Sequence, residues 1–206
     1  MSALVIFLHG VGSRGADLAG LGGMWGPQLS DTAFAAPDAP FAFDQGGPGR
    51  QWFSVRGVTE ADRPQRVVDA RMAFDQTIRA IIEANGFADR LDRVAFVGFS
   101  QGSIMALDAV ASGRWPVGVV VAFSGRLASP KPLAPATGTK VLLVHGDADP
   151  VIPALESAHA EATLQTAGVD AHHQRLRGLG HTISAEGAAI AGKFLADVFG
   201  AVAVSE

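Results

Sequence analysis

Short apolar segments rich in β-branched residues recur along this 206-residue chain, and most of them end at a glycine or proline. Continuous apolar runs of this kind are typical of strands buried on both faces of a parallel sheet. Segments with helical periodicity separate them. This order of elements predicts a three-layer α/β fold, with helices on both sides of a mostly parallel sheet. The six expected strands are 3–8, 32–36, 93–99, 117–123, 140–144 and a more polar edge strand, 171–176.

The clearest expected helix covers 64–84, where apolar side chains recur at helical spacing along one stripe. Further helices are expected at 100–111, 154–167 and 184–199. Two segments are expected to form long loops: 43–62, which is rich in glycine, and 126–139, which contains three prolines. Neither is a domain linker, and a chain of this length is most simply one domain over residues 1–206.

Composition narrows the class of protein. Apolar residues make up 48% of the chain and charged residues 17%, and the net charge of −4 without a basic cluster argues against nucleic-acid binding. The chain has no cysteine, which excludes disulfides and cysteine-ligated zinc and is compatible with a reducing compartment. No apolar stretch reaches the roughly 20 residues that a membrane span needs. We therefore expect a soluble, cytoplasmic protein without integral membrane contact.

One five-residue motif points to a specific chemistry. The sequence Gly98-Phe99-Ser100-Gln101-Gly102 stands between an expected strand and an expected helix. This is the pattern of a nucleophile elbow, a tight turn that holds a serine in a strained backbone conformation, with neighbours too close to tolerate a Cβ. A glycine-rich turn before a helix can show the same pattern, but it needs no partner residues elsewhere. The motif therefore indicates a nucleophilic Ser100 only together with a base and an acid.

Candidate partners follow other expected strands, at the sheet edge where functional groups of open parallel sheets gather. His181 lies between the last strand and the last helix and is the expected base. The turn after the strand 140–144 contains two carboxylates, Asp147 and Asp149. Asp149 directly precedes Pro150 and is biased toward an extended conformation, which favours it as the acid and leaves Asp147 to brace the turn. On this evidence alone, both carboxylates stay open as the acid.

Acyl transfer to a serine also requires two N–H donors for the charge that develops on the carbonyl oxygen. One is expected at Gln101, where the elbow helix begins, and the other at Val11, in the glycine-rich turn after the first strand. His9, beside that turn, and His145, which begins the acid turn, are expected to be hydrogen-bonding struts. No histidine spacing suggests a metal site, and we expect neither a metal nor an organic cofactor.

The glycine-rich turn also has a rival interpretation. The segment 10–15 has the GxGxxG spacing of a dinucleotide-binding loop, and Asp38 follows at a tolerable distance. That motif requires a helix to open at the turn. Four glycines and a proline between positions 20 and 27 make the next stretch a poor helix, so nucleotide binding is disfavoured.

Taken together, the motifs resemble those of the phospholipase/carboxylesterase family of α/β-hydrolases, which includes bacterial carboxylesterases, lysophospholipases and acyl-protein thioesterases. The resemblance implies an α/β-hydrolase fold without a large cap domain. It also implies Asp149 as the acid, and the amides of Val11 and Gln101 as the oxyanion donors. The segments that carry it are 8–12, 36–40, 51–53, 98–102, 145–153 and 180–181, so it covers most of the chain.

These observations predict a cofactor-free serine carboxylesterase that hydrolyses small to medium-chain carboxylic esters through an acyl-enzyme. Trp52 and Phe53 are expected either to wall the acyl site or to anchor their loop in the core. A lysophospholipase or acyl thioesterase is the alternative, and a non-catalytic hydrolase-like binding protein is a weaker one. The expected partner is a small-molecule ester, while a homodimer and the identity of the natural substrate stay open.

Overall fold

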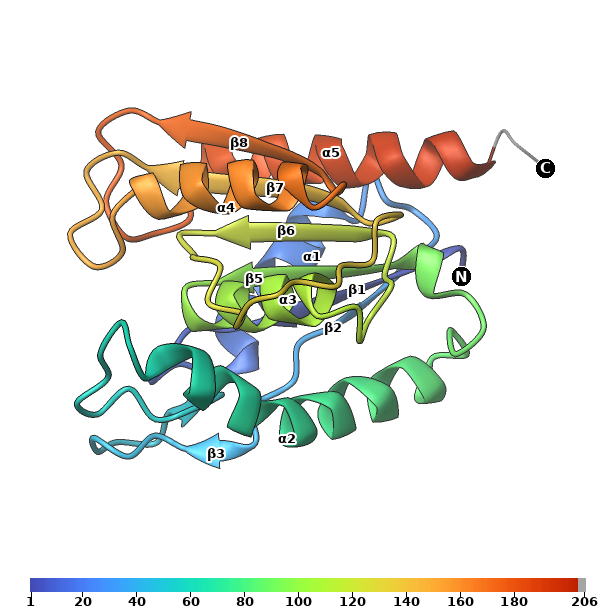
Figure 1. Cartoon of the computed structure of the whole chain (residues 1–206). Coiled ribbons are helices and arrows are strands. Elements are labelled where there is room, and N and C mark those ends of the chain that lie inside the picture. Colours follow the sequence, from blue (N-terminus) through green and yellow to red (C-terminus); the bar gives the residue numbers. More distant parts are fainter. Residues whose placement is uncertain (204–206) are drawn as a thin grey trace.

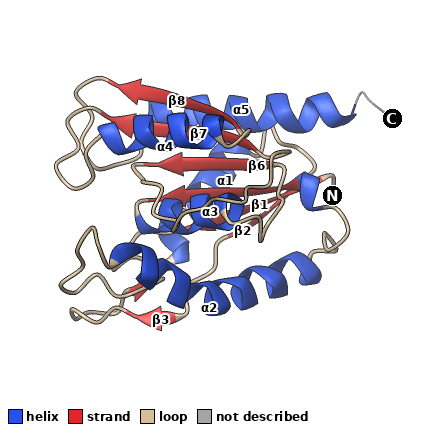
Figure 2. Cartoon of the chain, in the orientation of Figure 1, coloured by secondary structure: helices blue, strands red, loops and turns tan. Residues whose placement is uncertain are grey.

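The computed structural model describes residues 1–203 and contains a six-stranded sheet in which every neighbouring pair of strands is parallel. The strand order is β2-β1-β5-β6-β7-β8. Because every pair is parallel, the strands all point the same way, as the arrowheads of β6, β7 and β8 show in Figure 2. The carboxyl ends of β1, β5, β7 and β8 are thereby gathered along one edge. The strands are β1 (Ala3–Leu8), β2 (Thr32–Ala35), β5 (Val94–Phe99), β6 (Val119–Phe123), β7 (Lys140–Gly146) and β8 (Asp170–Leu176).

Helices cover both faces of the sheet (Figure 1). One face packs against α2, α3 and α4, and the other against α1 and α5. Each apolar side chain that is fully buried between these layers contributes roughly 1.5–3 kcal/mol to folding. The helices are α1 (Ala19–Trp25), α2 (Arg63–Ala84), α3 (Gln101–Ala111), α4 (Leu155–Thr166) and α5 (Ala185–Ala203).

A buried ion-pair network joins α3 to α2. The carboxylate of Asp108 has no exposed side-chain surface, and it accepts hydrogen bonds from Arg71 at 2.9 and 2.8 Å and from Arg114 at 2.8 Å. Ser129 donates a further bond at 2.7 Å. Burial raises the pKa of Asp108, but the bonds from Arg71 and Ser129 outweigh it and leave this pKa below its usual value. The network thus anchors α3, the helix that follows the elbow, to α2 near the C-terminal end of α3.

The six expected strands and the four expected helices are present, with small shifts at their ends, and β8 is an edge strand as predicted. The expected loop 43–62 is not wholly irregular. It contains β4 (Arg50–Gln51), which pairs in antiparallel fashion with β3 (Phe41–Ala42). Gly12 N donates to Arg50 O at 2.8 Å, so this hairpin holds the turn that follows β1.

The expectation that the stretch after the glycine-rich turn would not form a helix was wrong, because α1 lies there. Its glycines lower helix propensity, but one of them allows close packing: a Cβ at Gly22 would lie 3.1 Å from the ring of Phe34. Trp25 is fully buried, and its indole Nε1 donates to Ala188 O at 2.9 Å. Tertiary burial therefore overrides local propensity. None of the helices in the described part of the chain is both long and apolar enough to cross a membrane.

Candidate active site

Ser100 occupies the sharp turn between β5 and α3. Its backbone has φ 53° and ψ −114°, a conformation that L-residues rarely adopt, and its N–H donates to Phe123 O at 2.9 Å. A Cβ at Gly98 would overlap the backbone of Ser103, and a Cβ at Gly102 would overlap the carbonyl oxygen of Leu8. Both glycines are therefore required by close backbone approach, and the turn projects the Ser100 side chain beyond the end of the sheet.

A chain of hydrogen bonds connects Ser100, His181 and Asp149. The Nε2 atom of His181 lies 3.0 Å from Ser100 Oγ, and its Nδ1 atom lies 2.7 Å from Asp149 Oδ2. The Asp149 carboxylate has no exposed side-chain surface and the His181 imidazole only 17%. These three residues are contributed by the turn after β5 and by the loops after β7 and β8, far apart in sequence but adjacent in space.

The two carboxylates of the acid turn have different partners. Asp149 Oδ1 accepts the amides of Val151 and Ile152, at 2.8 and 3.0 Å, which leaves Oδ2 directed at His181. Burial raises the pKa of Asp149, but the bonds from His181 and from these two amides outweigh it and leave the pKa below its usual value. Asp147 instead accepts the amide of Gly178 at 2.6 Å and braces the neighbouring loop.

His145 supports Asp149 from the other side. Its Nε2 atom lies 2.9 Å from Ile152 O and 3.2 Å from Asp149 Oδ2. A carbonyl oxygen only accepts, so Nε2 carries a proton. On the other side of the ring, Nδ1 lies 2.6 Å from Ser157 Oγ. This buried imidazole is a hydrogen-bonding strut, as the sequence suggested.

A second strut, His9, shapes the turn that contains Val11. His9 Nε2 accepts the amide of Ala39 at 2.9 Å, so its protonated Nδ1 donates to Gly10 O at 2.7 Å. Burial lowers the pKa of His9, which keeps this imidazole neutral. The indole Nε1 of Trp52 donates to His9 O at 2.9 Å. The turn between β1 and α1 is therefore held from two sides, beside Ser100.

Gln101 links the elbow to the segment that follows the hairpin. It is the first residue of α3, so its own amide N–H has no partner within the helix. Its buried side chain accepts the amide of Trp52 at 2.8 Å and donates to Phe53 O at 2.7 Å. The elbow, the turn after β1 and the segment 52–53 thus form one hydrogen-bonded unit.

Ser100 and Gln101 line a pocket of about 200 Å³ together with Val11. Phe53 lies in its wall, as do two arginines, Arg63 and Arg126. Sequence reasoning missed both arginines, although Arg126 follows β6 at the same edge of the sheet as the other functional residues. The remaining lining residues are apolar: Val55, Val58, Ile104, Val151 and Ile152.

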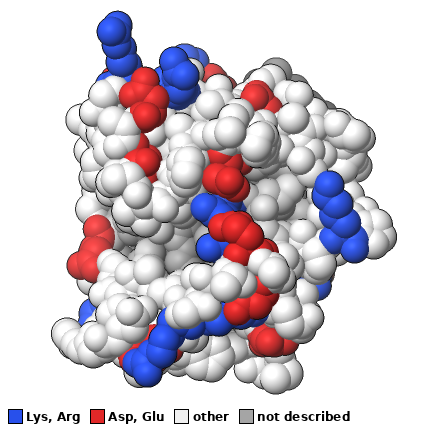
Figure 3. Space-filling model, turned by 60° about the vertical axis from the view of Figure 1, so that its left-hand side comes forward, with Lys and Arg blue, Asp and Glu red and all other residues white. Residues whose placement is uncertain are grey.

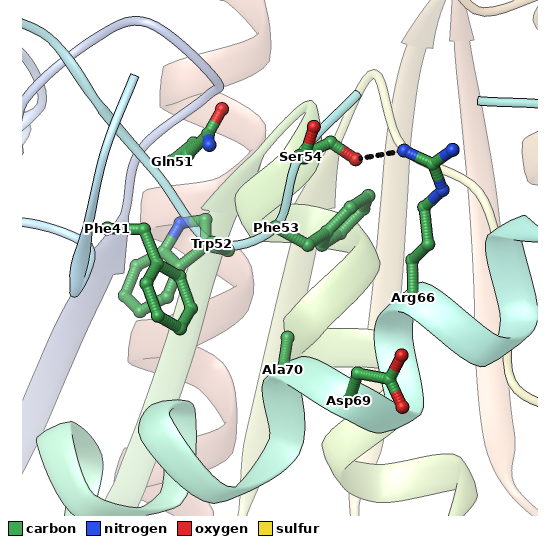
Figure 4. A pocket seen from close by; sticks show the side chains of 8 residues that line it. All are labelled: Phe41, Gln51, Trp52, Phe53, Ser54, Arg66, Asp69 and Ala70. Carbon is green, nitrogen blue, oxygen red and sulfur yellow. Dashed lines mark hydrogen bonds between the residues drawn. The ribbon is translucent and has the colours of Figure 1, made fainter. Parts of the chain in front are cut away.

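Trp52 does not line the pocket that contains Ser100. It faces a second and larger pocket of about 410 Å³, which is shown in Figure 4 and which lies between the hairpin and α2. Phe53 borders both pockets. In Figure 4, Arg66 reaches across the end of this second pocket to Ser54, whose carbonyl oxygen accepts from it at 2.9 Å. Of the two aromatic residues expected near the substrate, the structure brings only Phe53 next to Ser100.

The residues of the rival dinucleotide motif have structural roles in this fold. Asp38, the acidic residue of the rival dinucleotide motif, accepts the amide of Gly15 at 2.9 Å and so braces the turn itself. A Cβ at Gly15 would overlap Ala36 O, so packing between backbone segments explains this glycine. Within residues 1–203, no cluster of three or more histidine, aspartate or glutamate side chains could hold a metal ion.

Comparison with known proteins identifies the family to which this chain belongs. The phospholipase/carboxylesterase family model matches residues 1–199, and the chain belongs to this family of α/β-hydrolases. Esterase YpfH of Escherichia coli (strain K12) is 35% identical over 181 residues, which are 87% of this chain and 76% of that protein. Acyl-protein thioesterase 1 of Mycosarcoma maydis is 31% identical over 170 residues, which are 73% of this chain and 70% of that protein.

Solved structures agree with this assignment of fold. The crystal structure of esterase PE8 matches with a TM-score of 0.88 at 33% identity, over 96% of this chain and 93% of that one. The carboxylesterase of Bacillus cereus matches with a TM-score of 0.80 at 15% identity, over 95% and 88%, a likeness of fold alone. The α/β-hydrolase fold expected from the sequence is confirmed, and within residues 1–203 no large cap domain covers the edge of the sheet where Ser100 lies.

Proposed function

We propose that this protein is a serine carboxylesterase in which Ser100, His181 and Asp149 form the catalytic triad. The observation that carries the proposal is the continuous chain of hydrogen bonds from Ser100 Oγ through His181 to Asp149 Oδ2, at the mouth of a small pocket. A serine hydroxyl is a poor nucleophile at neutral pH until an adjacent imidazole accepts its proton. The arrangement supplies that imidazole and the carboxylate that orients it.

The mechanism follows from these positions. Ser100 Oγ attacks the ester carbonyl carbon while its proton passes to His181 Nε2, and Asp149 stabilises the resulting imidazolium. The carbonyl oxygen gains negative charge, which the amides of Val11 and Gln101 stabilise. His181 then protonates the departing alcohol, which leaves an acyl group on Ser100. Water, deprotonated by the same imidazole, releases the carboxylic acid and restores the hydroxyl.

The size of the pocket supports a short acyl group. Its volume of about 200 Å³ lies below the roughly 300–1,000 Å³ of pockets that enclose drug-sized ligands. Its apolar walls suit an alkyl chain. The larger pocket in Figure 4 lies on the other side of Phe53 and does not reach Ser100. We therefore expect small to medium-chain esters to be better substrates than long-chain ones.

The test is the turnover of p-nitrophenyl butyrate by the wild type and by Ser100→Ala. The wild type is expected to release a burst of p-nitrophenol and to react with a fluorophosphonate probe. Ser100→Ala is expected to lose labelling, and its kcat should fall by at least about 10⁴-fold. Ser2→Ala, at the opposite end of the sheet, is the control and should retain both. Undiminished turnover by Ser100→Ala would refute the assignment, and an unlabelled wild type would favour a non-catalytic binding protein.

An acyl thioesterase is the second candidate, because the chemistry is shared and one relative is named acyl-protein thioesterase 1. The same triad would attack a thioester carbonyl, and a lysophospholipase would use it in the same way. A panel of oxygen esters and thioesters with matched acyl chains of 2 to 16 carbons, roughly the range from a small pocket to a long groove, separates these functions. A maximum at long chains would favour the lysophospholipase or acyl-protein thioesterase.

A further inference from the structure

Two arginines in the pocket of Ser100 have no part in the mechanism above. Arg63 is the first residue of α2, and Arg126 lies in the loop after β6; their side chains are only 15% and 9% exposed. Arginine is almost never buried to this degree unless it is paired. Neither guanidinium contacts Ser100, His181 or Asp149 within hydrogen-bonding distance. Their place in the pocket wall therefore needs a separate explanation.

The carboxylate that pairs with both arginines is Glu60. A single oxygen, Oε1, lies 2.6 Å from Nη1 of Arg63 and 2.6 Å from Nη1 of Arg126. The side chain of Glu60 is 77% exposed, in contrast to the arginines that it joins. Glu156 is a weaker partner, since its Oε2 lies 3.8 Å from Arg126 Nε. Two largely buried cations thus share one carboxylate that stands mostly in water.

Within residues 1–203, the side chains that line the cavity include two cations and no anion. Among the described residues that form its wall, Arg63 and Arg126 are charged and positive, and no acidic side chain is present. In Figure 3, where the carboxyl ends of the strands come forward, basic and acidic atoms lie side by side at the edge of a central hollow. Glu60, which pairs with both guanidinium groups, is not among the residues that line the cavity.

An exposed carboxylate is easily replaced. A surface ion pair contributes little, since its solvated side chain loses conformational freedom and regains good hydration when released. The adjacent guanidinium of Arg63 lowers the pKa of Glu60, so this group is an anion at neutral pH and resembles the anion that could replace it. A guanidinium presents a planar fork of donors that matches a carboxylate. Glu60 thus occupies the position that a substrate carboxylate would take.

Resting on the proposed esterase activity, we infer that Arg63 and Arg126 determine specificity for esters that carry a carboxylate a few bonds from the reacting carbonyl. A monoester of a short dicarboxylic acid fits this description. Its ester carbonyl would lie at Ser100, its methylene chain against the apolar wall, and its free carboxylate between the two arginines, with Glu60 displaced toward water. The small volume of the cavity limits the chain between the two ends.

The experiment compares kcat/KM for monomethyl glutarate with that for methyl valerate, which has the same carbon chain length in the acid but no charge. The wild type is expected to prefer the anionic ester. Arg126→Met should reduce this preference about tenfold, mainly through KM, because one charge-assisted contact is lost. Arg126→Lys should retain part of it. Glu60→Gln should increase the preference several-fold, since it removes the competing carboxylate.

Arg90→Met is the matched control. Arg90 lies at the opposite end of the sheet, where it stacks over Phe87, and its loss changes the net charge equally without touching the pocket. It should leave both rates unchanged. The inference is overturned if the wild type hydrolyses methyl valerate at least as well as monomethyl glutarate, or if Arg126→Met and Arg90→Met change the preference equally. If Ser100→Ala still hydrolyses methyl valerate, the proposed function itself has failed.

Discussion

Replacement of Asp149 by asparagine gives the sharpest test of the proposed mechanism, because the structure decides how the new amide must lie. Oδ1 of Asp149 accepts two backbone amides, from Val151 and Ile152. The asparagine oxygen must take this position, since the opposite orientation would set an NH₂ group against two N–H donors and lose two hydrogen bonds, each contributing about 1 kcal/mol. The NH₂ group then faces Nδ1 of His181.

That orientation reverses the tautomer of His181. An NH₂ group donates, so Nδ1 must accept, and the imidazole proton moves to Nε2, which faces Ser100. Nε2 can then no longer take the serine proton. The expected loss in kcat is about 10⁴-fold, which corresponds to about 5 kcal/mol of transition-state stabilisation.

The assay is kcat and KM for p-nitrophenyl butyrate across pH, with Asp147→Asn as the matched control. In Asp147→Asn, the side-chain amide oxygen can still accept the backbone amide of Gly178. Turnover by this variant should therefore change less than about threefold. Fluorophosphonate labelling should slow in Asp149→Asn and be retained in the control. A loss in Asp147→Asn that equals or exceeds the loss in Asp149→Asn would refute both the assignment of the acid and the tautomer argument.

Three further predictions concern stability, each measured by urea unfolding. Gly102→Ala should destabilise the fold by several kcal/mol, of the order seen for severe steric strain, because its Cβ would overlap Leu8 O. Gly23→Ala is the control: a Cβ there has open space around it, so this variant should be neutral or slightly stabilising. Equal effects of the two substitutions would contradict the packing argument. Gln101→Met leaves the amide of Trp52 and the carbonyl of Phe53 without partners, so the free energy of unfolding should fall by about 2–5 kcal/mol. A fall below about 0.5 kcal/mol would show that the hydrogen bonds of the Gln101 side chain are dispensable. Asp108→Asn should lower the free energy of unfolding by about 3–5 kcal/mol. Because the folded-state pKa of Asp108 is lowered, the wild type should be more stable than the variant by this full amount above the unfolded-state pKa of 3.8. The difference in stability should shrink as pH falls through the folded-state pKa. An advantage of Asp108 that grew on acidification would contradict that sign.

Much of the fold was predictable because the four central strands, β1, β5, β6 and β7, are buried on both faces, which makes their apolar runs continuous and easy to recognise in the sequence. The elbow was predictable for a different reason: Gly98 and Gly102 are each forced by contact with another backbone segment. The helix α1 was not predictable from local propensity. It depends on Trp25 and Gly22, whose partners, Ala188 and Phe34, lie elsewhere in the chain.

The candidate site also has features that the sequence predicts and features that it does not. The location of Ser100, the acid turn and His181 after separate strands could be predicted, because functional groups gather at the carboxyl ends of parallel strands. The choice between Asp147 and Asp149 could not be predicted in this way, because both stand in one short turn and their partners come from distant loops. The direction in which Trp52 points depends on its bond to His9 O, and the roles of Arg63 and Arg126 depend on a contact with Glu60. None of these contacts has a periodic signal in the sequence.

The close approach of Gly102 to Leu8 has a consequence for how such a protein can change over time. With no side chain between the end of β1 and the start of α3, Ser100, the proposed nucleophile, and the turn that contains Val11 form one closely packed floor. The groups that we propose to surround a substrate, including Arg126, Glu60 and Phe53, come from loops attached around that floor. Substitutions in these loops can alter what is bound while the reacting groups keep their spacing, so new specificities can evolve without rebuilding the chemistry.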